Sequence, residues 1–199
     1  MSIKTLSKLD APKNISNSEK TLGDNDFIVS KTDTKGKIIY CNEIFVKMAG
    51  YPPADLIGAN HNLIRHPDMP RIAFKVAWDL IQDKKEFFGF VKNLSADGSY
   101  YWVLAYITAD VDASGKIESY TSVRRKPPQS AVNAIKPIYK QLLDAERSGG
   151  IDASAKILEN LLEANKVSYD EFVINLQKGA SLWVYLLYLV VAKAVVKQS

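Results

Sequence analysis

Short runs of apolar residues alternate with polar residues and turn residues between positions 27 and 125. Five of these runs are rich in β-branched and aromatic residues: 27–29, 37–40, 87–94, 100–110 and 116–125. The turn sequence Asp33-Thr-Lys-Gly36 separates the first two runs and predicts a hairpin. Turn sequences at 96–99 and 112–115 separate the last three. This pattern predicts five strands that pair in an antiparallel sheet.

Helical signals fill the interval between the second and third predicted strands. Asn42 can cap a helix from Glu43 to Ala49, and Gly50 can end it. A short helical turn is expected at 52–57, before Gly58. A longer helix is expected from Pro70 to about Gln82, with Asp68 as its cap. The expected fold class is therefore α+β, with helices on one face of a single five-stranded antiparallel sheet.

The chain changes character near residue 127 and divides into three predicted regions. Residues 1–24 are polar and read as a mobile arm, and 25–126 form the sheet domain. Residues 127–199 form a helical extension. Its helices are expected at 130–147, 151–164 and 167–177, with an interruption or kink at Pro137 and a joint at Ser148-Gly149-Gly150.

The nearly apolar tail 182–196 leaves three interpretations open. It can pack against a partner or a second copy of the chain, lie at a membrane surface, or form a short membrane span. Lys193 and Lys197 could place their ammonium groups in water beside a membrane. Trp183, Tyr185 and Tyr188 suit a protein interface and a membrane surface equally well.

Composition excludes some classes of function. The net charge is +4, but the basic residues are scattered, and Arg124-Arg125-Lys126 is their only short run. This distribution disfavours nucleic-acid binding. Cys41 is the single cysteine and Met1 to Lys20 contain no apolar core of a secretion signal. The expected location is the cytoplasm, either free or at the inner face of the cytoplasmic membrane.

The segment from Gly58 to Pro70 contains the greatest density of chemically active groups. It includes both histidines, His61 and His66, together with Arg65 and Asp68. The histidines are five positions apart and no cysteine or carboxylate cluster accompanies them, so a metal site is disfavoured. No nucleophile in a suitable context lies nearby, so an enzyme is disfavoured as well. A loop that satisfies its own polar groups is the structural alternative.

A longer succession of residues favours a ligand-binding loop over a loop that satisfies its own polar groups. In chain order it comprises Asn42-Glu-Ile-Phe45, Gly50-Tyr51, Leu56-Ile-Gly58, His61-Asn62, Arg65-His-Pro-Asp-Met-Pro70, Phe74, Trp78, Gly89, Val91-Lys-Asn93, Asp97-Gly98 and Tyr101-Trp102-Val103. This succession resembles the PAS domain of the Aer family of energy-taxis (aerotaxis) receptors. The resemblance covers about residues 24–125 and continues more weakly to Asp144.

The resemblance implies a PAS fold that holds FAD non-covalently between its helices and its sheet. The cofactor-binding residues that it implies are Asn42, His61, Asn62, Arg65, His66, Asp68, Phe74, Trp78, Phe87 and Asn93. Arg65 could pair with a pyrophosphate or an electronegative flavin edge, and Phe74 and Trp78 could wall a planar ring. Phe87 stands where the family usually has tryptophan, which keeps a stacking surface but loses the indole N–H.

The function that the resemblance implies is a redox or oxygen sensor for energy taxis. The transmembrane hairpin, HAMP segment and coiled coil of full receptors do not follow the PAS region in this sequence. We therefore expect a stand-alone sensor subunit of a split system, whose partner is a methyl-accepting chemotaxis receptor or another HAMP-containing membrane protein. A diverged anchor in 182–196 and a homodimer are alternatives. A cofactor-free PAS adaptor and a haem-based gas sensor that uses His61 or His66 also stay open.

Overall fold

The computed structural model describes residues 5–178. Contacts between residues divide this part of the chain into two units. The sheet unit comprises residues 5–69 and 76–126, and the helical unit comprises 70–75 and 127–178. The apolar segment 182–196 lies outside the described residues. Within residues 5–178, no helix combines the length and the apolar character that crossing a membrane requires.

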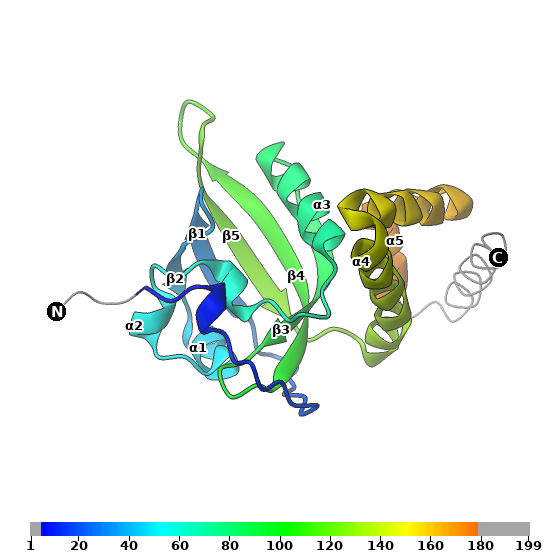
Figure 1. The fold of residues 1–199 in the computed structure, drawn as a ribbon. Helices are drawn as coiled ribbons and strands as arrows, with labels where there is room; N and C mark the ends of the chain where they lie inside the picture. Colours follow the sequence, from blue (N-terminus) through cyan, green and yellow to red (C-terminus); the bar gives the residue numbers. More distant parts are fainter. Residues whose placement is uncertain (1–4, 179–199) are drawn as a thin grey trace. The chain divides into compact units, whose positions relative to one another are not determined.

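Five strands form one antiparallel sheet, as predicted. They are β1 (Ile28–Asp33), β2 (Ile38–Cys41), β3 (Phe87–Leu94), β4 (Tyr100–Val111) and β5 (Ile117–Arg125). Their order across the sheet is β2-β1-β5-β4-β3 (Figure 1). The Asp33 carboxylate accepts hydrogen bonds from the Lys35 and Lys37 amides, at 2.9 and 2.8 Å, and so closes the β1–β2 turn.

Short helices cover one face of this sheet. They are α1 (Glu43–Ala49), α2 (Pro53–Leu56) and the 3-10 helix η2 (His61–Ile64). The Asn42 side chain accepts a hydrogen bond from the Phe45 amide at 3.1 Å, and Gly50 ends α1 at φ 74°, so both predicted caps are confirmed. Phe45 and Leu63 are fully buried in a core that includes Tyr101, Val103 and Ala105 of β4.

The register of the strands defines two faces, because directly opposed residues in antiparallel strands point to the same side. Asn93 lies opposite Tyr101, Ala105 opposite Arg124, and Ile28 opposite Arg124. These residues belong to the inner face, which meets α1 and η2. Lys92 lies opposite Trp102 on the outer face. Residues 101–105 of β4 are buried on both sides, as their apolar pattern predicted.

The described part of the N-terminal region is docked on the sheet unit, which differs from the expected mobile arm. The Lys20 amide donates to the Tyr100 carbonyl at 2.7 Å, and the Tyr100 amide donates to the Ser18 carbonyl at 3.0 Å. β5 pairs with β4 only from Leu104 onward, so the start of β4 has a free edge that this segment fills. A polar composition did not reveal this backbone pairing. The segment also contains η1 (Lys8–Asp10) and the buried Leu22.

Two long helices make up most of the helical unit. Helix α4 (Gln129–Asn165) contains non-helical backbone at Gly150, with φ 71° and ψ −168°, which confirms the predicted joint. The helix is not interrupted at Pro137, where an interruption or a kink was expected. Helix α5 (Tyr169–Gln177) starts with a capping box between Ser168 and Glu171.

Helix α3 (Arg71–Gln82) begins in the helical unit and ends in the sheet unit. The sequence predicted that Asp68 caps this helix by accepting hydrogen bonds from its first N–H groups. The amides of Arg71 and Ile72 donate instead to the carboxylate of Glu146, each at 2.9 Å. Glu146 is 74 residues from Ile72 along the chain, so no local pattern could indicate this contact.

Candidate functional site

A buried arginine is at the centre of the polar groups on the inner face. Arg124 of β5 donates from Nη2 to the Ser30 hydroxyl at 3.0 Å and contacts His61 Nε2 at 2.7 Å. The His61 ring stacks on Phe45 with centroids 5.6 Å apart, and the guanidinium lies 5.5 Å from the same Phe45 ring. Strands β1 and β5 and helices α1 and η2 therefore bring these four side chains together. We call Ser30, His61 and Arg124 the inner polar cluster.

Burial sets the charges of this cluster. Desolvation of the guanidinium lowers the pKa of Arg124 to about 10, so the side chain remains cationic at neutral pH. Desolvation and the Arg124 charge hold the pKa of His61 well below its usual value, so the imidazole is neutral. A guanidinium can only donate hydrogen bonds, so Nε2 of His61 is the acceptor and its proton is on Nδ1. Within residues 5–178, no carboxylate forms an ion pair with Arg124.

Several buried polar atoms around this cluster have no hydrogen-bond partner among the described residues. On the inner face they are Asn93 Nδ2, Tyr101 Oη, Ser122 Oγ and Arg124 Nη1, and Tyr51 Oη shares this property. Burial also raises the pKa of Tyr101, which is therefore a neutral hydroxyl. An unsatisfied buried polar group costs roughly 1–3 kcal/mol. Four such groups on one face make this face a candidate site for a polar ligand.

Aromatic side chains extend the same face. Trp78, in the part of α3 that belongs to the sheet unit, meets Tyr120 edge-on with centroids 5.3 Å apart. Tyr120 lies opposite Ala109 on the inner face, and Phe87 lies opposite Ile107 on that face. Phe87 is buried, whereas Trp78 is only partly buried. Phe74 is partly buried and belongs to the portion of α3 that clusters with the helical unit.

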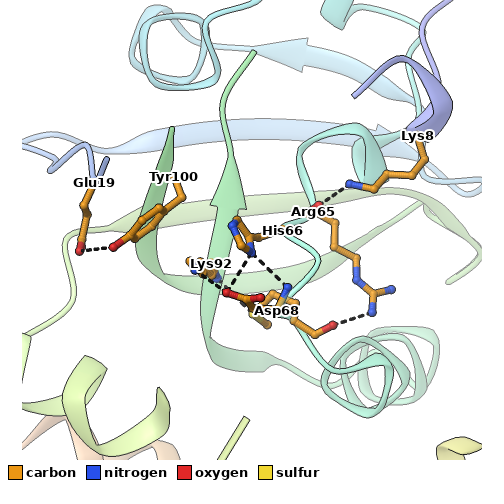
Figure 2. Close-up of polar contacts among 8 residues, drawn as sticks. Lys8, Glu19, Arg65, His66, Asp68, Lys92 and Tyr100 are labelled. Atoms are coloured by element: carbon orange, nitrogen blue, oxygen red, sulfur yellow. Dashed lines mark hydrogen bonds and ion pairs between the residues drawn. The ribbon is translucent and has the colours of Figure 1, made fainter. Parts of the chain in front are cut away.

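His66 and Asp68 lie in a different cluster, at the edge of the sheet and toward its outer face (Figure 2). The Lys92 ammonium contacts the Asp68 carboxylate at 2.6 Å and lies 4.2 Å from the centre of the Tyr100 ring. His66 Nδ1 accepts a hydrogen bond from the Asp68 amide at 3.1 Å. Burial and the Lys92 charge lower the pKa of His66 to about 4. The His66 ring is therefore neutral at pH 7.

Arg65 braces the loop that carries these residues. Its guanidinium donates to the Met69 carbonyl at 2.8 Å, and its own carbonyl accepts from the Lys8 ammonium. An isolated antiparallel bridge joins Arg65 to Asn93, which attaches the loop to the free edge of β3. Figure 2 shows the guanidinium of Arg65 directed away from His66 and toward the turn that precedes α3. The loop therefore uses much of its polar capacity within the chain.

The structure thus separates the residues that the resemblance implied. His61, Trp78, Phe87 and Asn93 lie on the inner side of the sheet, and His66 and Asp68 lie at its outer edge. Asn42 uses its amide to bond the backbone of Phe27, Val29 and Phe45, and Asn62 is exposed. Ser30, Tyr101, Ser122 and Arg124 were not among the residues predicted for the site. Strand alternation would have placed Ser122 and Arg124 on one face, but Arg124 was interpreted only as part of a basic run.

Comparison with known proteins agrees with this architecture. Residues 38–124 match the family model described as the PAS fold, so the sheet unit is a PAS domain. The chain is 37% identical over 121 residues to the aerotaxis receptor of Escherichia coli, and the aligned region covers 61% of this chain and 24% of that protein. It is 30% identical over 97 residues to a nitrogen fixation regulatory protein of Klebsiella oxytoca, covering 49% of this chain and 20% of that one.

One solved structure, of a light-oxygen-voltage domain studied with a flavin analogue, aligns with this chain with a TM-score of 0.49 and 22% sequence identity. It covers 55% of this chain and 82% of that chain. The chain spans about a quarter or less of the length of the two curated relatives. The similarity to these relatives therefore concerns a sensor domain and not the whole of either protein.

Proposed function

We propose that this PAS domain binds FAD non-covalently against the inner face of its sheet and acts as a redox or oxygen sensor in energy-taxis signalling. The observation that carries the proposal is the buried Arg124, which has an unsatisfied Nη1 and no acidic partner among residues 5–178. A cation held inside a domain without a counter-charge is costly unless a ligand completes it.

The residues present fit a flavin. Arg124 offers hydrogen-bond donors with positive charge, and Asn93 and Tyr101 offer an amide and a hydroxyl without partners in the described chain. Trp78 and Phe87 offer flat apolar surfaces on the same side of the sheet. The similarity to the aerotaxis receptor over 121 residues supports the same choice of ligand. Bound FAD would supply a ring that gains and loses electrons reversibly at physiological potentials.

The inner polar cluster gives such a site a means of response. Arg124 favours negative charge beside it, because the desolvated guanidinium has no acidic partner in the described chain. The same charge contributes to the low pKa of His61. Added negative charge next to Arg124 would raise the pKa of His61 and so favour protonation of Nε2. Protonation of His61 would then force the contact of 2.7 Å to rearrange.

The proposed output is a contact with a methyl-accepting chemotaxis receptor or another HAMP-containing membrane protein. The similarity to the aerotaxis receptor supports a place in chemoreceptor signalling, and the identity of the partner is part of the proposal. A homodimer, and contact of the segment 182–196 with a membrane surface, belong to the same proposal as testable features. We propose a cytoplasmic location for the domain.

The first experiment is the absorption spectrum of the aerobically purified chain, before and after dithionite. A two-banded flavin spectrum that bleaches on reduction is expected. A protein that is colourless and does not bind added FAD would refute the flavin proposal. Capture of a receptor by such a protein would then establish the adaptor function.

A haem sensor is distinguished in the same measurement by a Soret band. The structure disfavours His61 as an axial ligand, because its Nε2 faces the Arg124 guanidinium at 2.7 Å. A Soret band that a single His61→Ala or His66→Ala change abolishes would establish the haem function instead.

A further inference from the structure

Helix α3 connects the candidate flavin site to the helical unit through continuous backbone. Residues 76–82 of this helix belong to the sheet unit and carry Trp78 against Tyr120, while residues 70–75 belong to the helical unit. The first turn is held there by Glu146 of α4. Oε2 of Glu146 accepts from the Arg71 amide and Oε1 accepts from the Ile72 amide, each at 2.9 Å.

Glu146 also holds the part of α4 that follows the break at Gly150. The Ser154 hydroxyl lies 3.1 Å from Oε1 of Glu146 and 2.8 Å from the Ile151 carbonyl, so its one proton is shared between these acceptors. The left-handed backbone of Gly150 allows the chain to return to this position. The side chain of Glu146 is 4% exposed, whereas that of Arg71 is 56% exposed. The backbone and hydroxyl contacts of Glu146 are therefore buried, while its ion pair with Arg71 is open to water and weak.

A carboxylate is well suited to this junction. It meets the positive end of the α3 dipole, and charge-assisted hydrogen bonds are stronger than neutral ones. Each oxygen serves one backbone amide, so a rotation or a shift of the first turn of α3 breaks at least one of the two bonds. Oε1 is shared with Ser154, so a shift at Ile72 also changes the contact that holds the second segment of α4.

We propose that Glu146 is a positioning residue that couples the helix carrying Trp78 to residues 150–165 of α4. A displacement of α3 at the inner face is passed by the helix to its first turn, and Glu146 passes it to Ser154. This inference rests on the proposed flavin function, because the redox state of the ligand is the signal that would displace Trp78. Its mechanical part, the joint response of the first turn of α3 and the start of the second α4 segment, can be measured without a ligand.

The test is hydrogen exchange, measured by mass spectrometry on the full chain in flavin-free, oxidised and dithionite-reduced samples. The variant is Glu146→Gln, and the matched control is Arg71→Gln, which removes only the exposed ion pair. Without flavin, E146Q should speed exchange by about tenfold in peptides covering both 70–76 and 150–158, as expected for loss of a charge-assisted bond. R71Q should leave both unchanged. In the wild-type chain, flavin reduction should alter exchange in 150–158, and E146Q should abolish that response.

The outcomes separate the two proposals. A wild-type chain that binds no flavin refutes the proposed function, and the flavin-free samples still decide whether Glu146 joins the two peptides. Faster exchange in only one of the two peptides, or a redox response in 150–158 that survives in E146Q, overturns the coupling. If E146Q lowers the yield of folded chain, Ser154→Ala tests the junction from the other side. Faster exchange at 70–76 in that variant supports the coupling, and unchanged exchange there overturns it.

Discussion

Replacement of Arg124 by methionine should stabilise the ligand-free chain while it removes flavin binding. A tenfold change in an ionisation constant is worth 1.36 kcal/mol, and burial lowers the pKa of Arg124 from its usual value above 12 to about 10. The charged form therefore carries an unfavourable free energy of about 3 kcal/mol in the folded chain. Since the pKa is lower in the folded state, this cost is fully present at every pH below about 10.

The substitution also removes two favourable contacts. Arg124 donates to the Ser30 hydroxyl at 3.0 Å and to His61 Nε2 at 2.7 Å, and each hydrogen bond of this kind contributes about 1 kcal/mol. Methionine is of similar length and flexible, so it can fill the vacated volume against Phe45. The expected net effect on the ligand-free chain is a stabilisation of about 1 kcal/mol. Because the donors to the ligand are lost, the FAD dissociation constant should rise by at least about tenfold.

Urea unfolding of the flavin-free protein measures the first quantity, and titration with FAD measures the second. Arg125→Met is the matched control, because the neighbouring Arg125 is exposed and should change neither quantity. Arg124→Lys retains the charge without the planar donor set and should bind FAD with intermediate affinity. An Arg124→Met protein that is destabilised by more than about 1 kcal/mol and still binds FAD normally would show that the arginine is structural, and the reasoning would be wrong.

Three further predictions concern the surroundings of the site. Gly98→Ala should release the segment 5–22, because a Cβ at this position would lie 2.2 Å from the Asn14 carbonyl oxygen, and faster trypsin cleavage at Lys13 and Lys20 would show the release. The control is Gly115→Ala, where φ is similarly positive but the nearest atom lies 3.8 Å from the added Cβ, and cleavage should be unchanged. His66 should lower the stability of the wild-type chain by roughly 2–3 kcal/mol between pH 7 and pH 4.5, because the unfolded chain binds a proton at His66 whose uptake the folded chain resists until about pH 4. Burial also lowers the pKa of His61, which adds to the fall, so His66→Gln should reduce the fall measured by urea unfolding without abolishing it, and a fall as large as that of the wild-type chain would contradict the assignment. Lys92→Met should change stability by less than about 1 kcal/mol and leave FAD affinity unaltered, because its partner Asp68 is 61% exposed and lies toward the outer face. Loss of the flavin spectrum in this variant would instead place Lys92 and Asp68 in the binding site.

Local patterns predicted the elements of the fold well, because they depend on interactions within a few residues. Asn42 and Gly50 are the caps that their positions indicated, and the Asp33 turn joins the first two strands as expected. The docking of the N-terminal segment and the contact of Glu146 with α3 could not be predicted in this way. Each depends on partners more than 70 residues apart in the sequence, and the polar residues that make these contacts are equally common on solvated surfaces.

The candidate site was predictable only in part, for the same physical reason. A motif shows which residues occur together in the chain, but not on which face of a sheet each side chain lies. Arg65 illustrates the difference: its backbone bridges to Asn93, and its guanidinium holds the Met69 carbonyl just before α3. It therefore fixes the positions of Asn93 and of the helix that carries Trp78, without lying on the inner face itself. Loss of flavin on substitution of Arg65 would follow equally from lost bracing and from lost contact. Arg124 does not share this ambiguity, because removing it should lower the affinity for the ligand and raise the stability of the empty domain.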